Sequence, residues 1–361
     1  MAGFKHRLKR LARSVYSRTL VHTGLWRLVD RWMPPRLVIL AGHCVRDPET
    51  NGGLPEDMKI EAEKLERALR VLGRRFVHVT VGEGVAALAA GPTRSMVALS
   101  MDDGYKDNRT VLLPLLERTG ARATIFLESR PLVERRVSWS HKWFWLVAKL
   151  GAEGAGEALV NGDAPEAIRK RFWHELDLER TSEEDLAYRL KRVLKYEAEP
   201  EARDAALDEL FRQHGGDGRA LCERIYLDAD DVRALAESGR VEIGGHTVRH
   251  EVLATLDPAD AEAEVLGGRD ALRRELGDRA GTSFAYPYGR RWDFDDASVA
   301  AVEAAGYRAA VTTHPTANLE DADLFRLGRW MIDDRTPLHL LRTEAAGGFT
   351  LLRRMGIELA E

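Results

Sequence analysis

Short apolar runs rich in β-branched residues recur along the chain and predict buried strands. These runs cover residues 37–45, 76–81, 96–101, 123–127, 241–245, 283–286 and 308–313. Stretches with apolar residues at helical spacing lie between most of them, for example at residues 57–72, 110–117, 258–276 and 296–305. Alternation of buried strands with helices is typical of a parallel sheet that helices cover. The pattern therefore predicts an α/β fold, either an open sheet or, as we favour, an α/β barrel.

One connection is much longer than a strand-to-strand link requires. Residues 128–240 separate two predicted strands, whereas a crossover usually needs about 10 to 12 residues plus loops. The stretches HKWFWLVAKL, APEAIRKRFWHEL and TSEEDLAYRLKRVLKY within it have helical period and many charges. We therefore expect a folded helical insertion at about residues 129–221. Its aromatic residues, Trp139 and Trp143 among them, could stack on sugar rings, although a hydrophobic core is the expected role of most of them.

Residues 1–36 are predicted to form a segment separate from the domain of residues 37–361. The stretch MAGFKHRLKRLARSVYSR mixes basic and apolar residues at helical spacing, including Phe4, Lys5, Arg7, Leu8, Lys9, Arg10, Leu11, Arg13, Val15 and Arg18. It lacks the apolar core and cleavage site of a secretory signal, and no later segment is long and apolar enough to span a bilayer. We expect a cytoplasmic protein whose amino-terminal helix contacts the inner face of the membrane. The alternative is a helix that packs on the barrel and closes its amino-terminal end.

The composition fits one large α/β domain with an insertion. The 361 residues are 44% hydrophobic and 31% charged, which is ample for a buried core. A formal net charge of -4 provides no overall attraction to phosphate backbones, so no nucleic-acid partner is expected. The two cysteines, Cys44 and Cys222, form no CxxC pair, which argues against a disulfide framework and against a thiolate zinc site.

Acidic and imidazole side chains follow two of the predicted strands. Asp102 and Asp103 come directly after an apolar run in ALSMDDGYKDN, and VEIGGHTVRHEVL places His246 and His250 four residues apart. Since the carboxyl ends of parallel strands share one rim, these side chains are expected to meet there. If the chain turns helical after Gly245, both imidazoles face the same way. Two histidines and one carboxylate suit zinc or a similar divalent metal and leave a position open for water.

A third strand ends in the sharp turn of SFAYPYG. Tyr286, Pro287 and Tyr288 in this turn could direct a backbone N–H and a phenol toward the rim, where they would contact substrate or stabilise an oxyanion. Proline and glycine are also common at strand exits of every kind, so the turn has a purely structural interpretation as well.

In these motifs the chain resembles the polysaccharide deacetylases of the NodB-homology type, a carbohydrate esterase family. SMDDGYKDN, HTVRH and FAYPYG are similar to the family's first, second and third motifs, and the resemblance covers about residues 37–332. It implies a deformed (β/α) barrel and a bound divalent metal, with Zn²⁺ expected. It also implies that Asp102 is the general base, that Asp103, His246 and His250 are the metal ligands, and that the Tyr288 backbone N–H faces the oxyanion.

The chain departs from the family pattern at two places. Many members begin the third motif with an arginine that orients the catalytic base, but the matching residue here is Ala285. Members also commonly carry a late Leu-x-His that acts as general acid, whereas the corresponding strand here reads FRLGRWMI. We expect His43 to replace that histidine because it follows the first strand. His314 is the alternative, and His339 in TPLHLL is a poor candidate because it lies in a predicted helix.

The expected reaction is metal-dependent removal of an N-acetyl group from a sugar residue of a polysaccharide or its precursor. One alternative is a deformylase or other amidase that acts on a lipid-linked sugar with the same chemistry. Another is a carbohydrate-binding protein with a degraded active site, which Ala285 and the missing late histidine suggest. The expected partner is accordingly an acetylated saccharide or a lipid-linked sugar.

Overall fold

A single curled parallel sheet organises the molecule. The computed structural model describes residues 2–162, 164–178 and 182–357, and among residues 2–10 it describes only the side chain of Lys9. The strand order is β10-β1-β5-β6-β7-β8-β9, and β4 also pairs with β5. The strands are β1 (Leu37–Gly42), β4 (Val77–Val79), β5 (Met96–Met101), β6 (Ala123–Leu127), β7 (Val241–Gly245), β8 (Ala280–Ala285), β9 (Ala309–Val311) and β10 (Trp330–Met331). Every pairing is parallel, which confirms the predicted α/β class.

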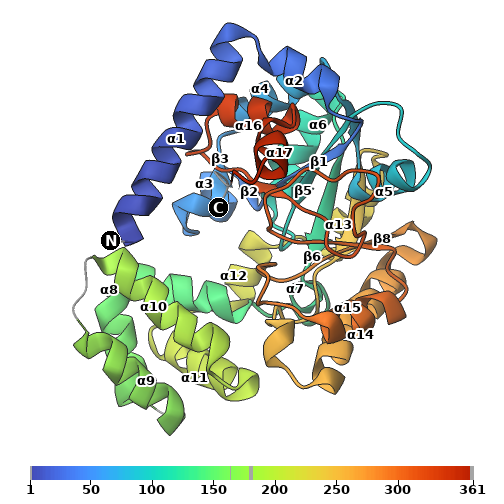
Figure 1. The fold of residues 1–361 in the computed structure, drawn as a ribbon. Coiled ribbons are helices and arrows are strands. Elements are labelled where there is room, and N and C mark those ends of the chain that lie inside the picture. Colours follow the sequence, from blue (N-terminus) through green and yellow to red (C-terminus); the bar gives the residue numbers. More distant parts are fainter. Residues whose placement is uncertain (1, 163, 179–181, 358–361) are drawn as a thin grey trace.

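Helices surround this sheet and bury its outer face (Figure 1). They are α4 (Ala62–Leu72), α6 (Leu113–Thr119), α13 (Ala229–Glu237), α14 (Pro258–Leu276), α15 (Asp296–Ala304), α16 (Leu338–Ala345) and α17 (Gly348–Arg354). One further helix, α5 (Val81–Ala89), packs on the other face of the sheet. Successive strand residues alternate between two cores: Val38 and Leu40 pack toward the helices, while Leu37 and Ile39 belong to a cluster with Phe126. Because both faces are apolar, the strands read as continuous hydrophobic runs in the sequence.

Two predicted helices begin differently from the sequence-based expectation. The helix predicted at residues 57–72 begins at Ala62, because the preceding residues form a short 3₁₀ turn and then β3 (Lys59–Ile60). That strand pairs with β2 (Cys44–Val45), which shortens the predicted first strand and adds a small two-stranded sheet. The helix predicted at residues 110–117 follows a π-helical turn at Asn108–Leu112. At residues 59–60, pairing with β2 thus prevents the helix that the spacing of apolar residues predicts.

The long connection between β6 and β7 folds into helices that lie together beside the barrel (Figure 1). They are α7 (Ser129–Glu134), α8 (Trp139–Asn161), α9 (Glu166–Asp177), α10 (Glu183–Tyr196), α11 (Pro200–Gln213) and α12 (Gly218–Ile225). Trp139, Trp143 and Phe172 are buried in one hydrophobic cluster there. Trp139 and Trp143, which were considered for stacking on sugar rings, therefore belong to the core of the insertion.

The amino-terminal segment comprises α1 (Ala2–Thr23) and α2 (Trp26–Trp32). One face of α1 packs on the carboxyl-terminal helices, where Leu20 is buried and the Tyr16 hydroxyl donates a hydrogen bond to the Gly348 carbonyl at 3.0 Å. Leu11 and Val15 on the same helix stay exposed. The side chains of Phe4, Lys5, Arg7, Leu8 and Arg10, which contributed to the predicted amphipathic pattern, lie outside the described residues.

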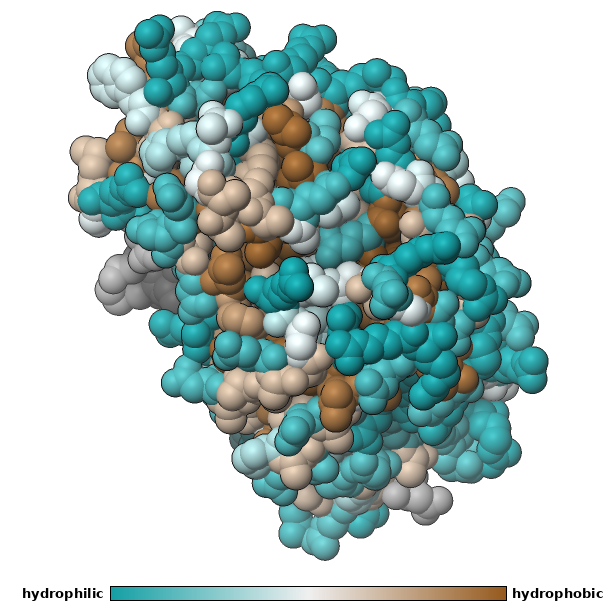
Figure 2. Space-filling view, turned by 90° about the vertical axis from the view of Figure 1, so that its right-hand side faces the viewer, coloured by the Kyte–Doolittle hydropathy of each residue, from teal (hydrophilic) through white to brown (hydrophobic). Residues whose placement is uncertain are grey.

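The surface is mostly polar. Figure 2 shows one face of the molecule covered chiefly by hydrophilic side chains, with hydrophobic ones scattered between them. Over the described ranges, no helix has both the length and the apolar character that a bilayer crossing requires. The boundaries of the segments at residues 1–36, 37–361 and 129–221 remain a proposal.

Candidate active site

The two aspartates lie at the carboxyl end of β5, where the chain leaves the sheet. Asp102 still continues the ladder, since its N–H donates to the Gly42 carbonyl at 2.9 Å. Asp103 and Gly104 then adopt left-handed backbone conformations, with φ of 71° and 78°. In a regular strand, neighbouring side chains point to opposite faces. Because the backbone leaves the strand conformation at Asp103, both carboxylates can lie on the same rim of the barrel. A β-carbon at Gly104 would lie 2.3 Å from Leu127 Cδ2, so glycine is required there.

The two histidines lie on a loop after β7, so a helical turn at HTVRH is not what makes them converge. His246 N–H donates to the Leu127 carbonyl of β6 at 3.0 Å, which extends the strand pairing by one residue. Thr247 and His250 adopt left-handed conformations, with φ of 65° and 58°. The Thr247 hydroxyl accepts the His250 N–H at 3.0 Å, which stabilises this turn.

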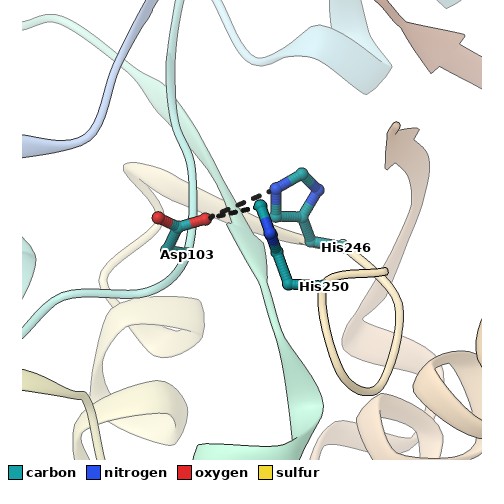
Figure 3. Close-up of side chains that lie close together, drawn as sticks. All are labelled: Asp103, His246 and His250. Carbon is teal, nitrogen blue, oxygen red and sulfur yellow. Dashed lines mark ion pairs between the residues drawn. The ribbon is translucent and has the colours of Figure 1, made fainter. Parts of the chain in front are cut away.

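Asp103, His246 and His250 converge on one point. Asp103 Oδ1 lies 3.4 Å from His246 Nε2 and 3.3 Å from His250 Nε2, and Figure 3 shows the carboxylate facing both rings. Tetrahedral Zn²⁺ with bonds of about 2.0 to 2.2 Å places neighbouring ligand atoms roughly 3.3 to 3.6 Å apart, which matches this spacing. These three residues form the only cluster of potential metal ligands found within the described residues.

Two further observations fit a metal at this point. Asp103 Oδ1 is buried without a hydrogen-bond partner in the described part of the chain. His246 Nδ1 donates to the Ala285 carbonyl at 2.7 Å, which leaves the Nε2 lone pair directed toward Asp103. Burial alone would raise the pKa of Asp103, but the neighbouring His250 and His246 outweigh it and hold that pKa well below its ordinary value. The carboxylate is therefore ionised, as a metal ligand must be.

A buried arginine holds the second carboxylate. Arg329 Nη1 and Nη2 donate to the two oxygens of Asp102 at 2.7 and 2.9 Å, and Arg329 Nε donates to the Thr312 carbonyl at 2.9 Å. Burial would raise the pKa of Asp102, but the Arg329 charge outweighs it and the pKa is lowered. Arg329 directly precedes β10, so Asp102 is oriented from that side of the sheet and not from β8, where Ala285 has no charged side chain. Arg329 was not predicted from the sequence, although it lies in the segment FRLGRWMI, because nothing in that segment indicates its partner.

The turn after β8 sends its two tyrosines to different places. The Tyr288 ring packs on His250 with centroids 4.6 Å apart, and its backbone is left-handed with φ of 61°. Tyr286 is fully buried, stacks on Phe294 at 4.1 Å and donates to the Phe325 carbonyl. The expectation that Tyr286 contacts substrate is therefore wrong, because it occupies a hydrophobic core. Pro287 is buried, and its carbonyl accepts the Gly289 N–H at 2.7 Å.

Several groups on the rim could carry a proton. His43 follows β1, is half-buried, and acts electrostatically on both Asp102 and Asp103. His339 lies on α16 beside Arg18 and His22, away from the rim. Sequence reasoning also missed Glu128, which directly follows β6. Its Oε1 is buried without a partner among the described residues, and burial, followed by the Asp103 charge, raises its pKa well above the ordinary value.

A chain of buried hydrogen bonds connects the insertion to Asp103. The Tyr105 hydroxyl donates to Asp103 Oδ2 at 2.7 Å and lies 2.7 Å from His141 Nε2, at the start of α8. The Tyr226 hydroxyl lies 2.8 Å from His141 Nδ1. Because a carboxylate can only accept, Tyr105 must donate to it, and His141 Nε2–H must donate to Tyr105. Burial lowers the pKa of His141 to about 3, so the ring is neutral and accepts at Nδ1.

Two lysines of α10 also face this region. Lys195 Nζ lies 3.3 Å from the centroid of the Tyr288 ring and 3.1 Å from Asp293 Oδ1. Burial lowers the pKa of Lys195 to about 7 and that of Lys191 to about 8, and the Asp103 charge acts on Lys191. The insertion thus contributes cationic and hydrogen-bonding groups to the candidate site, which no local motif indicated.

Comparison with known sequences points to one family. The polysaccharide deacetylase family model matches residues 205–310, which include the second and third motifs. The Bacillus subtilis protein YxkH, assigned by its name to the polysaccharide deacetylases, is 27% identical over 112 residues. This alignment covers 31% of the present chain and 38% of YxkH, so it spans well under half of either protein.

Comparison with solved structures extends the relationship over the fold. The Streptococcus pyogenes deacetylase PplD, solved with acetate, superposes with a TM-score of 0.54 at 15% identity, covering 87% of this chain and 99% of PplD. A de-N-acetylase from Aggregatibacter actinomycetemcomitans gives 0.51 at 17% identity, with 84% and 97% covered. IcaB from Ammonifex degensii gives 0.52 at 16% identity, with 86% and 97% covered. These similarities confirm the predicted deacetylase-type (β/α) barrel, and sequence and fold together relate this chain to the polysaccharide deacetylases.

Proposed function

We propose that the protein is a metal-dependent hydrolase that removes an N-acetyl group from a sugar residue of a polysaccharide or its precursor. The observation that carries this proposal is the pairing of two groups on one rim. Asp103, His246 and His250 form a three-ligand set, and an ionised Asp102 lies beside it, held by Arg329. The relationship to polysaccharide deacetylases supports the choice of an acetylated sugar.

The three ligands suit a divalent ion, and Zn²⁺ is the expected one. Such an ion, when bound, polarises a carbonyl oxygen and lowers the pKa of water from about 15.7 toward roughly 7. Two hydrogen bonds hold these ligands from behind. His246 Nδ1 donates to the Ala285 carbonyl, and the Tyr105 hydroxyl donates to Asp103. Both fix the orientation of a ligand, which usually matters for metal affinity.

The chain's own residues divide the proton transfers between them. Asp102 accepts the proton of the attacking water, and Arg329 keeps this carboxylate ionised and oriented. The Tyr288 N–H donates to the oxygen that becomes negative as water adds to the acetyl carbonyl. A protonated His43 or Glu128 then gives its proton to the departing nitrogen. The C–N bond breaks, and the products are acetate and the free amine of the sugar.

The alternatives differ from this proposal in product or in metal content. A deformylase or amidase on a lipid-linked sugar would use the same groups and release formate or another acid. A degraded carbohydrate-binding protein is the weaker alternative, because the ligand set is complete and Arg329 holds Asp102 in spite of Ala285. A cytoplasmic location with contact at the inner face of the membrane is likewise a proposal, supported by the basic residues of α1.

The test is mass spectrometry of acetylated saccharides and lipid-linked sugars before and after incubation with metal-loaded protein. Acetate release supports the proposal, whereas formate release from a lipid-linked sugar supports the first alternative. Asp102→Asn should retain the metal and lower kcat by about 10² to 10⁴, the usual contribution of a general base. Asp103→Asn should lose metal and activity together. A metal-free Asp102→Asn protein, or one with full activity, would contradict the assigned roles.

A further inference from the structure

An arginine-lined pocket lies at the end of the sheet opposite the candidate site. Its volume is about 490 Å³, and Arg27, Arg74, Arg75, Arg342 and His22 line it. None of its lining residues carries a carboxylate. The pocket includes the residues just before β4, whereas the aspartates follow the carboxyl end of β5. Six residues of β5 at about 3.3 Å each separate the two ends by roughly 20 Å. We call this feature the arginine pocket.

The positive charge of the arginine pocket is not balanced by the protein around it. Asp30 pairs with Arg75 at 2.7 Å and also with Arg36, so this one carboxylate serves two arginines. Arg27, Arg74 and Arg342 form no ion pair within the described ranges. The guanidinium groups of Arg27 and Arg75 both lie 5.1 Å from the centroid of the Trp26 ring. This ring holds two cations in place beside the pocket.

Large apolar side chains are exposed next to this charge. On α2 and just before it, Leu25 is 45% exposed, Leu28 52% and Trp32 83%, and α2 buries none of its residues. Leu11 and Val15 on α1 are also exposed. Apolar side chains without a partner beside a cluster of arginines are typical of a surface that lies on an anionic bilayer. Tryptophan in particular favours the interface between lipid and water.

We propose that this surface docks on an anionic phospholipid bilayer, with a lipid phosphate in the arginine pocket and Leu28 and Trp32 in the headgroup region. Guanidinium groups bind phosphate oxygens through paired hydrogen bonds, which suits a pocket of four arginines. A soluble phosphate would account for the arginines but would leave Leu28 and Trp32 exposed. The net charge of -4 also weighs against nucleic acid as the ligand. Docking here leaves the catalytic rim uncovered.

Vesicle flotation of the full-length protein tests the proposal. Vesicles of phosphatidylcholine are compared with vesicles of the same lipid mixed with phosphatidylglycerol. Wild-type protein should float with the second kind and not with the first, and high salt should weaken the binding. A variant with Arg27→Gln, Arg74→Gln and Arg342→Gln should lose roughly 100-fold in partition coefficient, the usual effect of three charges at an anionic lipid surface. Circular dichroism checks that it is folded.

Matched controls make the outcomes decisive. Arg169→Gln, Arg274→Gln and Arg308→Gln remove three exposed arginines from other parts of the surface, and this variant should bind as wild type does. The pair Leu28→Ser and Trp32→Ser should bind less tightly while retaining its charge. Equal flotation with both kinds of vesicle overturns the proposal, and so does an equal loss in the control variant. Undiminished flotation of the Leu28 and Trp32 variant overturns the placement of these two side chains in the headgroup region, because the arginines alone would then account for the binding.

Discussion

At the residue scale, the orientation of Asp102 depends on a partner that comes from a different strand than the family pattern suggests. Arg329 reaches Asp102 with two hydrogen bonds across 227 positions of sequence. Ala285, at the position where the family pattern described above has arginine, is fully buried on β8, and its carbonyl accepts from His246. The same electrostatic requirement, a cation against a buried carboxylate, is thus met from another side of the rim.

This arrangement predicts a compensating pair of substitutions. Arg329→Ala should keep the metal but lower kcat by about 10² to 10⁴, because the buried Asp102 loses the charge that keeps it ionised. Adding Ala285→Arg to that variant should restore part of kcat, since it returns a cation at the position where the family pattern has the arginine that orients the base. Steady-state kinetics measure kcat of the single and double variants, and metal analysis measures the amount of metal that each one binds. Arg326→Ala, an exposed arginine nearby, should leave kcat unchanged, and a double variant no better than Arg329→Ala would argue against positioning.

At the element scale, α8 of the insertion is connected to the candidate metal site through His141. The ring lies between Tyr105, which donates to Asp103, and Tyr226, so the position of one helix affects the orientation of one proposed metal ligand. All three side chains are buried, and buried hydrogen-bond networks tolerate the loss of a member poorly.

His141→Phe should therefore weaken metal binding. We expect the metal dissociation constant to rise by about 10- to 100-fold, the usual cost of losing a group that orients a ligand. Tyr226→Phe removes only the outer hydroxyl and should have a smaller effect. Competition with a chelator measures both constants. His78→Phe, at a part-buried histidine that contacts the Leu69 carbonyl instead, serves as the control. Metal affinity equal to wild type in His141→Phe would contradict this role.

Helix α16 carries a buried carboxyl that should make stability depend on pH. Burial raises the pKa of Glu344 to about 8 from an ordinary 4.5, against the opposing charges of Arg353 and Arg13. The folded protein therefore keeps a proton that the unfolded chain loses above about pH 4.5. This contribution to stability is complete below that pH and is lost as the pH rises through about 8.

Glu344→Gln should accordingly become more stable relative to wild type as the pH rises from 4.5 to 8, because only the wild-type protein loses stability when Glu344 ionises. We expect a relative change of roughly 2 to 4 kcal/mol across this window. Urea titrations at several pH values measure it. Glu303→Gln, at an exposed position, controls for the loss of a carboxyl. A constant difference between Glu344→Gln and wild type would mean that Glu344 is ionised in the folded protein.

At the scale of the whole molecule, the insertion is a second hydrophobic core joined to the rim of the barrel. Trp139 and Trp143 are each 1% exposed and pack with Phe172, so they stabilise the insertion and do not present stacking surfaces to a sugar. Through His141, Lys191 and Lys195 the same helices supply polar groups to the candidate site. The stability of the insertion and the geometry of the site are therefore linked.

Trp143→Ala should destabilise the protein by about 3 to 5 kcal/mol, the usual cost of truncating a large buried aromatic residue. Denaturant unfolding measures this change. Trp173→Ala should cost less than about 0.5 kcal/mol, because that side chain is 59% exposed. A Trp143→Ala protein of wild-type stability with a raised KM for saccharides would restore the stacking interpretation.

Local sequence patterns were sufficient to predict the strands, most of the helices and the convergence of four residues at the candidate site. Buried strands read as apolar runs, and the ends of parallel strands share a rim, so the convergence of Asp102, Asp103, His246 and His250 follows from their positions along the chain. The ends of the elements were harder to predict than the elements themselves. At β3, for example, pairing with β2 replaces the start of a predicted helix. The resemblance to polysaccharide deacetylases could be read from three short motifs for the same local reason.

The partners of these residues follow from the packing of the folded chain and not from local sequence. Arg329 meets Asp102, His141 meets Tyr105, and Glu128 is buried near Asp103 because distant segments pack together, and no local spacing encodes such contacts. The same is true of Tyr286. Its place in a strand-end motif predicted a contact with substrate, whereas in the fold it packs against Phe294 in a hydrophobic core. A strand pattern fixes the face on which a side chain lies, whereas burial, charge and hydrogen bonding are set by the segments that close over it.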